Sequence, residues 1–190
     1  MERTSIFLEM AANRKIQLFS FTLFLFLTIV SLTSYCQVQY SGKVETGFLK
    51  YRYQLVQYDL DPGSDWKGYY LDDEQDGIDL NLVNGVSFFE KRFSTGVGLG
   101  YQNFEGINGI TVFGDIEYLP LKSKLTPLLN IKVGYDHIWN QYEGGTGTAF
   151  GEFAAGVSYK LTEKLNIYLK SGILFTQQSS LIPIRIGLGF

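Results

Sequence analysis

The chain has 190 residues, of which 45% are hydrophobic and 18% charged, and its formal net charge is −3. This length suits one domain or two, the apolar fraction excludes a disordered chain, and the charge argues against a nucleic-acid-binding protein. One Cys and one His exclude a disulfide-rich scaffold and a metal centre made of several His or Cys. The 15 Phe, 13 Tyr and 21 Gly point instead to β-structure.

The N-terminal residues 1–36 differ from the rest of the chain. Arg14 and Lys15 precede a mostly apolar run over residues 16–30, which is the pattern of a secretory signal peptide. A membrane-anchor helix is the alternative, but it needs roughly 20 apolar residues. We therefore predict a signal peptide over residues 1–36, starting at Met1 or Met10, and a mature domain over residues 37–190.

The fate of Cys36 has two interpretations. Ser34 and Cys36 are small residues that a signal peptidase accepts, so cleavage after Cys36 is favoured. In the alternative, Cys36 is the acylated first residue of a lipoprotein. That signal normally has Gly or Ala before the Cys, where this chain has Tyr35.

From residue 37 onward, apolar and polar residues alternate with a period of two, which is typical of strands with two different faces. The first predicted strand, near residues 40–57, changes parity, and we expect a bulge near Phe48 and Leu49. The strands that follow are regular. They are predicted over residues 78–88, 93–101, 110–118, 125–139, 152–161, 165–173 and 182–190.

The connections alternate between two length classes. Long or moderate connections are expected over residues 58–77, 103–109 and 140–146, and short ones over residues 90–92, 120–124 and 162–164. This alternation predicts an all-β, eight-stranded antiparallel up-and-down barrel with one decorated end. The end with short turns carries Lys91, Arg92, Lys122, Lys124 and Lys164, and the first long loop is acidic.

Alternation alone fits a soluble ligand-binding barrel as well as a transmembrane one. An eight-stranded barrel is just wide enough inside to be filled by side chains. Gly, Ser, Asn and a few charges fit that space better than the large apolar face does. An outward apolar band would then need lipid to cover it, which favours the transmembrane barrel.

A signal peptide, eight alternating strands and the C-terminal sequence PIRIGLGF with Phe190 together resemble the small bacterial outer-membrane β-barrels of the OmpA and OmpX type. The resemblance implies location in the cell outer membrane, contact with outer-membrane lipid, and a monomer. Some relatives carry a periplasmic peptidoglycan-binding domain, which we do not expect here because the sequence stops at the last predicted strand. It also implies that the barrel assembly machinery reads the last strand. The residues of this signal would be Ile184, Ile186, Leu188 and Phe190.

Seven charged residues have the parity of the barrel interior. Buried charges are tolerated only when they are paired and hydrogen-bonded. We therefore expect a salt-bridged network that closes the lumen, while a pore is the alternative. These residues are Asp79, Asp115, Glu117, Lys132, Glu152, Lys170 and Arg185.

Three other features could suggest chemistry. The glycines Gly96, Gly98 and Gly100 alternate with strand residues, so they are interpreted as lumen-facing and not as a phosphate loop. His137 and Asp136 point to opposite faces and cannot readily form a dyad, so His137 is interpreted as interfacial beside Trp139. The acidic residues of the first long loop are interpreted as solvated, with a Ca²⁺ site as the alternative. They are Asp72, Asp73, Glu74 and Asp76.

These observations predict a non-enzymatic outer-membrane protein with no cofactor, no metal and no catalytic residue. Its expected role is in membrane integrity, or in surface binding through extracellular loops whose ligand the sequence does not name. Two alternatives remain open: a narrow porin-like channel for small solutes, and an outer-membrane enzyme acting on lipid A or peptides.

Overall fold

A computed structural model of the chain describes residues 38–54, 76–139, 145–176 and 179–190. These residues belong to one compact unit, Val38–Phe190. The predicted signal peptide, Cys36 and most of the acidic first loop lie outside the described residues. Among the residues that are described, no helix is long and apolar enough to cross a membrane.

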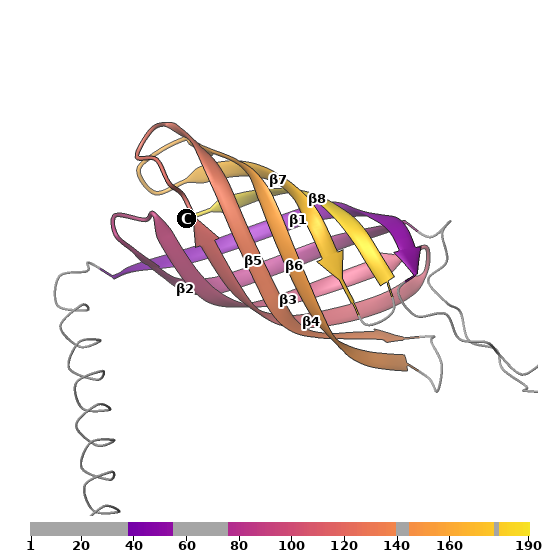
Figure 1. Ribbon diagram of the computed structural model, residues 1–190. Helices are drawn as coiled ribbons and strands as arrows, with labels where there is room; N and C mark the ends of the chain where they lie inside the picture. Colours follow the sequence, from indigo (N-terminus) through magenta and orange to yellow (C-terminus); the bar gives the residue numbers. More distant parts are fainter. Residues whose placement is uncertain (1–37, 55–75, 140–144, 177–178) are drawn as a thin grey trace, which may run out of the picture. The chain divides into compact units, whose positions relative to one another are not determined.

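Eight antiparallel strands form a closed barrel in which each strand pairs with the next and β8 pairs with β1 (Figure 1). The predicted all-β, up-and-down eight-stranded fold is therefore confirmed. The strands are β1 (Gln39–Gln54), β2 (Gly77–Phe88), β3 (Phe93–Phe104), β4 (Ile107–Tyr118), β5 (Leu125–Trp139), β6 (Gly145–Lys160), β7 (Asn166–Phe175) and β8 (Ser179–Gly189).

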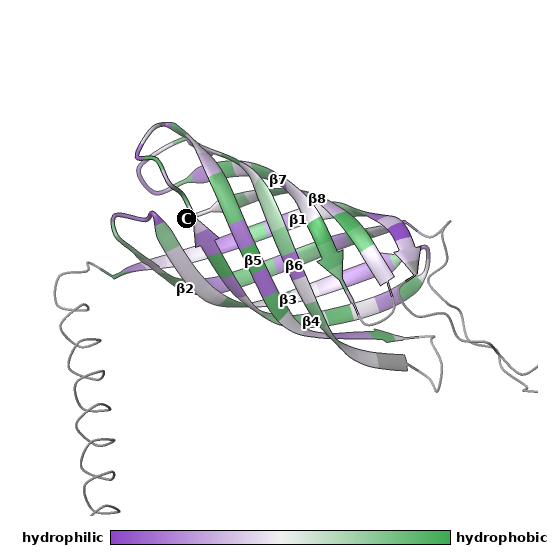
Figure 2. Ribbon diagram, viewed as in Figure 1, coloured by the Kyte–Doolittle hydropathy of each residue, from purple (hydrophilic) through white to green (hydrophobic). Residues whose placement is uncertain are grey.

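Inward and outward side chains alternate along the strands as their sequences predict. In β4 the burial alternates at every residue, with Thr111, Asp115 and Glu117 buried and Ile110 and Val112 exposed. Because the side-chain period of a strand is two, this pattern separates one sequence into two surfaces. Figure 2 shows the result as hydrophobic and hydrophilic residues alternating along the ribbons.

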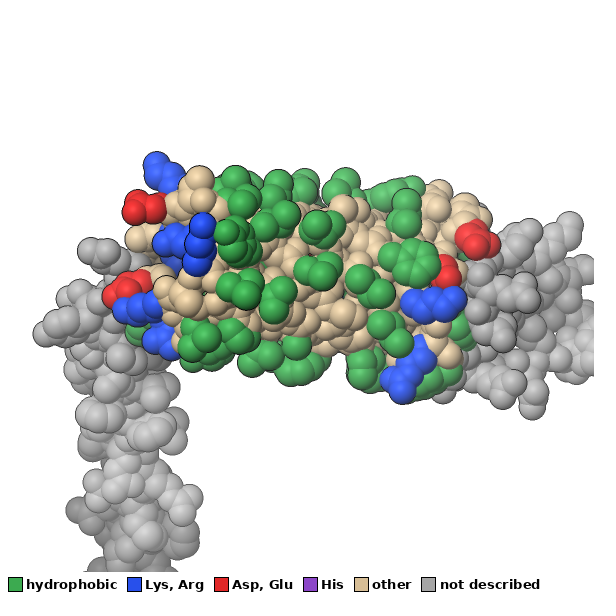
Figure 3. All heavy atoms as spheres, turned by 90° about the horizontal axis from the view of Figure 1, so that it is seen from above, with side chains coloured by type: hydrophobic (Ala, Val, Ile, Leu, Met, Phe, Trp, Pro, Cys, Tyr) green, Lys and Arg blue, Asp and Glu red, His purple; other side chains and the backbone are tan. Residues whose placement is uncertain are grey.

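The outer surface of the barrel is apolar over its middle. Leu82 and Leu99 are each more than half exposed, and Ile184, Ile186 and Leu188 of β8 also point outward. On the face shown in Figure 3, hydrophobic side chains lie across the middle of the barrel, and Lys, Arg, Asp and Glu gather at its two ends.

One connection differs from the expected moderate loop over residues 103–109. β3 and β4 are joined by only two residues, Glu105 (φ 49°) and Gly106 (φ 99°), and Phe104 pairs directly with Ile107. A two-residue turn with positive φ at both positions matches the right-handed twist of paired strands. The expectation failed because Asn103 and Gly109, which look like loop residues, belong to the strands.

The bulge predicted near Phe48 and Leu49 is absent, and the irregularity of β1 lies further along the strand. β1 pairs with β8 in continuous register from Lys43 to Tyr51, and the register shifts between Tyr51 and Tyr53. Phe48 and Leu49 are therefore regular. Tyr51 points into the barrel beside Leu181, whereas Tyr53 is exposed.

Candidate functional site

The seven predicted lumen charges all lie on the inner wall of the barrel, and none is more than 5% exposed. They come from β2, β4, β5, β6, β7 and β8, so nearly every strand contributes. The structure adds three inward charges that were not predicted as members of this set: Lys43 and Glu45 of β1, and Asp136 of β5. For Lys43 and Glu45, the sequence signal of an inward position was their alternation with Val44 and Thr46, which face outward.

Glu45 binds two lysines from other parts of the wall. One carboxylate oxygen lies 2.7 Å from Lys132 Nζ of β5, and the other lies 2.8 Å from Lys170 Nζ of β7. All three side chains are almost completely buried. Because β1 and β5 lie on opposite sides of an eight-stranded barrel, the Glu45–Lys132 pair crosses the lumen.

Asn130 connects this group to a second set of ion pairs. Lys170 Nζ donates to Asn130 Oδ1 (2.8 Å), and Asn130 Nδ2 donates to Asp115 Oδ1 (2.8 Å). The other oxygen of Asp115 accepts from Lys43 Nζ, which also lies 3.0 Å from Glu117 Oε2. One continuous polar network therefore joins β1, β4, β5 and β7.

Arg185 of β8 holds a separate cluster. Its Nε donates to Asp79 Oδ2 (2.6 Å) and its Nη1 donates to Glu152 Oε1. Asn81 Nδ2 also donates to Asp79 Oδ2 (3.0 Å). The guanidinium thus binds carboxylates from β2 and β6, on either side of its own strand.

The two clusters nearly balance in charge, with five carboxylates and four cations. Pairing of this kind is what makes buried charges tolerable, because each ion would otherwise lose its hydration without compensation. Side chains of this size also occupy much of the interior of an eight-stranded barrel. The network can hold opposite walls together and take up the space through which ions would pass.

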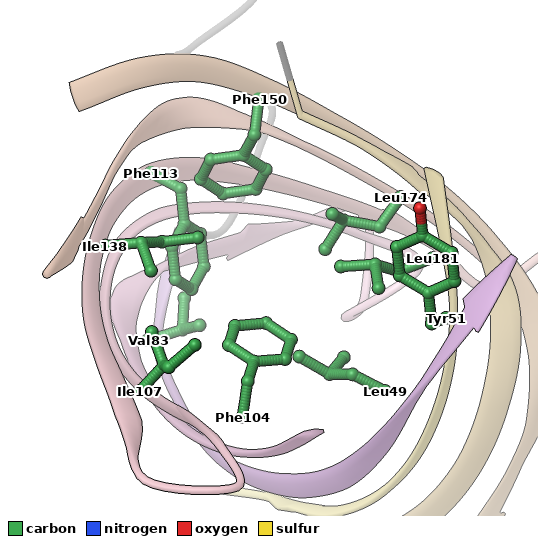
Figure 4. Packing of buried hydrophobic residues seen from close by; sticks show 10 residues of the cluster. All are labelled: Leu49, Tyr51, Val83, Phe104, Ile107, Phe113, Ile138, Phe150, Leu174 and Leu181. Atoms are coloured by element: carbon green, nitrogen blue, oxygen red, sulfur yellow. The ribbon is translucent and has the colours of Figure 1, made fainter. Parts of the chain in front are cut away.

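The lumen also contains an apolar cluster, which the expected interior of Gly, Ser, Asn and a few charges did not include. Figure 4 shows these side chains projecting inward from the wall. Phe113 and Phe150 meet edge to face at 6.1 Å, and Lys132 Nζ lies 4.6 Å from the centre of the Phe113 ring. The cluster therefore continues directly from the charged network. Its residues are Leu49, Tyr51, Val83, Phe104, Ile107, Phe113, Ile138, Phe150, Leu174 and Leu181.

Glycines on neighbouring strands make room for these large side chains. A Cβ at Gly98 would collide with the ring of Phe113, and one at Gly187 would collide with the ring of Tyr168. A Cβ at Gly100 would meet the side-chain oxygens of Asn81 and Thr111. The alternating glycines of β3 are thus lumen-facing positions, and they lie in a strand and not in a phosphate-binding turn.

His137 and Asp136 lie on opposite faces of β5. The His137 ring meets Trp139 edge to face at 5.1 Å. Asp136 points into the lumen, is 1% exposed, and neither carboxylate oxygen has a hydrogen-bond partner among the described residues. The structure therefore does not bring these two residues together.

Of the four acidic residues considered for Ca²⁺, Asp72, Asp73 and Glu74 lie outside the described residues. Asp76 accepts hydrogen bonds from Lys50 Nζ (2.8 Å) and Tyr51 N (3.1 Å). The hydrogen bond from Lys50 lowers the pKa of the Asp76 carboxyl below its ordinary value. No group of three or more His, Cys, Asp or Glu that could hold a metal ion occurs in the described part of the chain.

The predicted assembly signal lies on the outer face of β8. Ile184, Ile186, Leu188 and Phe190 are each between 43% and 49% exposed. Phe190 exchanges backbone hydrogen bonds with Gly42 (2.8 and 2.9 Å), and its ring lies 6.3 Å from that of Tyr40. The last residue therefore helps to close the barrel, whereas recognition by an assembly machinery stays a prediction.

No family model and no curated protein matches the chain. Among solved structures, the barrel is similar to Neisserial surface protein A, with a TM-score of 0.58, 9% identity, and coverage of 80% of this chain and 97% of that one. The N-terminal β-barrel domain of Pseudomonas aeruginosa OprF matches with a TM-score of 0.49 and 15% identity, over 81% of this chain and 100% of that one. Yersinia pestis Ail matches with a TM-score of 0.42 and 9% identity, over 80% of this chain and 100% of that one. The similarity to Neisserial surface protein A shows a shared fold, that of the small eight-stranded outer-membrane β-barrels.

Proposed function

We propose that this protein is an integral outer-membrane β-barrel without enzymatic activity, whose lumen is closed by the buried charge network. Its role is in membrane integrity or in surface binding through its extracellular loops. The observation that carries the proposal is an apolar outer surface wrapped around a paired, charged interior. A soluble barrel has the reverse arrangement, because water covers its outside.

The strand lengths support a membrane span. A transmembrane strand needs about 9–11 residues, and the strands here have between 10 and 16. Tyr40 and Phe190 at one end, and Trp139 at the other, provide aromatic side chains where a bilayer meets water. Charged residues gather at both ends of the face shown in Figure 3.

The paired interior supports a closed lumen. A channel for small solutes requires a continuous aqueous path, and eight strands leave room for little besides side chains. Glu45, Lys132 and Lys170 meet within this space, and the apolar cluster with Phe113 and Phe150 follows along the axis. The porin-like alternative therefore requires these side chains to separate.

The proposal assigns no catalytic residue. The only histidine of the chain, His137, packs against Trp139 on the face opposite Asp136. The enzyme alternative predicts that an activity on lipid A or peptides accompanies the purified protein and is lost in His137→Ala. Such a loss in a variant that still folds would contradict the proposal.

Cell fractionation tests the proposed location. We expect the protein in the outer-membrane fraction, extracted only by detergent, and migrating faster on gels before heating than after heating.

In a deletion strain, the wild-type gene should restore resistance to detergents or binding to a surface, and Glu45→Ala should restore less because fewer barrels fold. Recovery of the folded protein from the soluble periplasmic fraction would contradict the proposal.

A further inference from the structure

A cavity of about 420 Å³ opens at the turn end of the barrel, defined here as the end that carries the β2–β3, β4–β5 and β6–β7 turns. Its inner part is lined by Lys43 and Glu117, the last ion pair of the buried network, together with Ser94, Thr126 and Ser158. This volume lies within the range of small-molecule sites in proteins, about 300–1,000 Å³.

The rim of this cavity is strongly basic. All three turns contribute cations to it, and only two acidic side chains, Glu90 and Glu163, accompany them. In the lumen, by contrast, acids and bases nearly balance. The six rim cations are Lys91, Arg92, Lys122, Lys124, Lys160 and Lys164.

Only one of the rim cations is neutralised by a carboxylate among the described residues, since Lys122 pairs with Glu90. Lys91 Nζ donates to the backbone oxygen of Glu163 (3.1 Å), which joins two turns across the opening. Lys160 and Lys164 form no ion pair within the described ranges. The rim therefore carries uncompensated positive charge around an open volume.

Arg92 is the most constrained of these cations. Its Nη2 donates to the backbone oxygen of Pro120 (2.6 Å), which fixes the guanidinium between two turns. Its Nε is buried and has no hydrogen-bond partner among the described residues. A buried N–H donor without a partner is costly, because this N–H has lost its water and gained no hydrogen bond in return.

We propose that this turn-end cavity binds a phosphate group, with Arg92, Lys91, Lys160 and Lys164 as its cationic ligands. A guanidinium presents several donors in a planar fork that fits phosphate oxygens, and lysines add charge from several directions. Phosphate fits this set of cations better than a single carboxylate does, because its oxygens point in several directions and can accept hydrogen bonds from several cations at once. The group can belong to a phospholipid headgroup or to inorganic phosphate.

The test uses the refolded protein in octyl glucoside, a detergent without phosphate. Inorganic phosphate is titrated in one arm and dihexanoyl phosphatidylglycerol in the other, at constant ionic strength, and binding is followed by amide NMR shifts. Two pairs of substitutions remove rim cations, Arg92→Gln with Lys164→Gln and Lys91→Gln with Lys160→Gln. The matched control, Lys50→Gln with Arg52→Gln, removes the same charge at the opposite end. Heat-modifiable migration verifies that each variant is folded.

We expect saturable binding in at least one arm, and the arm that saturates identifies the source of the phosphate. Each rim pair should raise the dissociation constant about tenfold, because charge-assisted hydrogen bonds to the ligand are lost. The control pair should change it by less than about twofold, since exposed charges at this distance are screened by salt. Absence of saturation in both arms, or equal weakening by the control pair, would overturn the proposal.

Discussion

Glu45 of β1 and Lys132 of β5 form a 2.7 Å ion pair across the lumen, although their strands lie four places apart in the closed order of eight. The same carboxylate holds Lys170 of β7 at 2.8 Å. One side chain thus ties together three strands that do not pair with one another. Glu45 therefore links walls of the barrel that the strand ladder does not connect directly.

Glu45→Gln should destabilise the barrel by about 3–5 kcal/mol, because two buried lysines lose their countercharge. The measurement is the free energy of unfolding in urea, followed by tryptophan fluorescence in lipid vesicles. Glu90→Gln is the control, since it breaks the exposed Lys122–Glu90 pair at the turn end, and it should leave the unfolding midpoint unchanged. Equal effects of the two substitutions would contradict this role of Glu45.

Asp136→Asn should stabilise the barrel, whereas Glu45→Gln should destabilise it. Asp136 is buried, and both of its carboxylate oxygens lack hydrogen-bond partners among the described residues. Removing an uncompensated buried charge should raise the free energy of unfolding by about 1–3 kcal/mol. The same urea experiment at pH 8 measures this gain. A loss of stability would show that Asp136 has a partner in the folded barrel.

Gly98→Ala should destabilise the barrel by about 1–3 kcal/mol, because the new methyl group collides with the Phe113 ring. Phe113→Ala should remove most of that cost when the two substitutions are combined in a double-mutant cycle. Gly151→Ala is the control, since a Cβ there has no neighbour within 4 Å. Simple additivity of the Gly98 and Phe113 substitutions would show that the two positions do not share this space.

Lys50→Met should raise the pKa of Asp76 towards its ordinary value, because the hydrogen bond from Lys50 is the main cause of its lowering. A carboxyl group whose pKa is lowered by folding stabilises the fold at pH values above its unfolded-state pKa. This stabilisation is lost as the pH falls through the folded-state pKa. NMR titration of the Asp76 carboxyl in both proteins measures the change. An unchanged titration would mean that Lys50 does not hold this carboxyl.

The strand pattern made most of the fold predictable, because a period of two reports directly which face each residue occupies. It placed Asp115 and Ile116 on opposite faces without any knowledge of pairing. The inward positions of Lys43 and Glu45 were not predicted, because the parity change at the far end of β1 made the sequence of the whole strand look irregular. That irregularity is local to the register shift between Tyr51 and Tyr53.

Other features depend on register, which a single sequence does not define. Phe113 has inward parity, yet its place inside the barrel requires Gly98 opposite it on β3 and Gly134 opposite it on β5. The pairing of Glu45 with Lys132 depends on closure of the barrel, which brings residues 87 positions apart into contact. The turn-end cavity depends on turn conformations, including positive φ at Phe89, Glu90 and Lys91.

Planar-bilayer recording of the refolded protein tests the closed lumen most directly. Wild-type protein, shown to be inserted by its heat-modifiable migration, should give no steady conductance steps. A variant in which Glu45→Ala and Lys132→Ala remove the pair that crosses the lumen should conduct if it folds, because water gains the space between the walls. Steady conductance steps that scale with the amount of inserted wild-type protein would contradict the account.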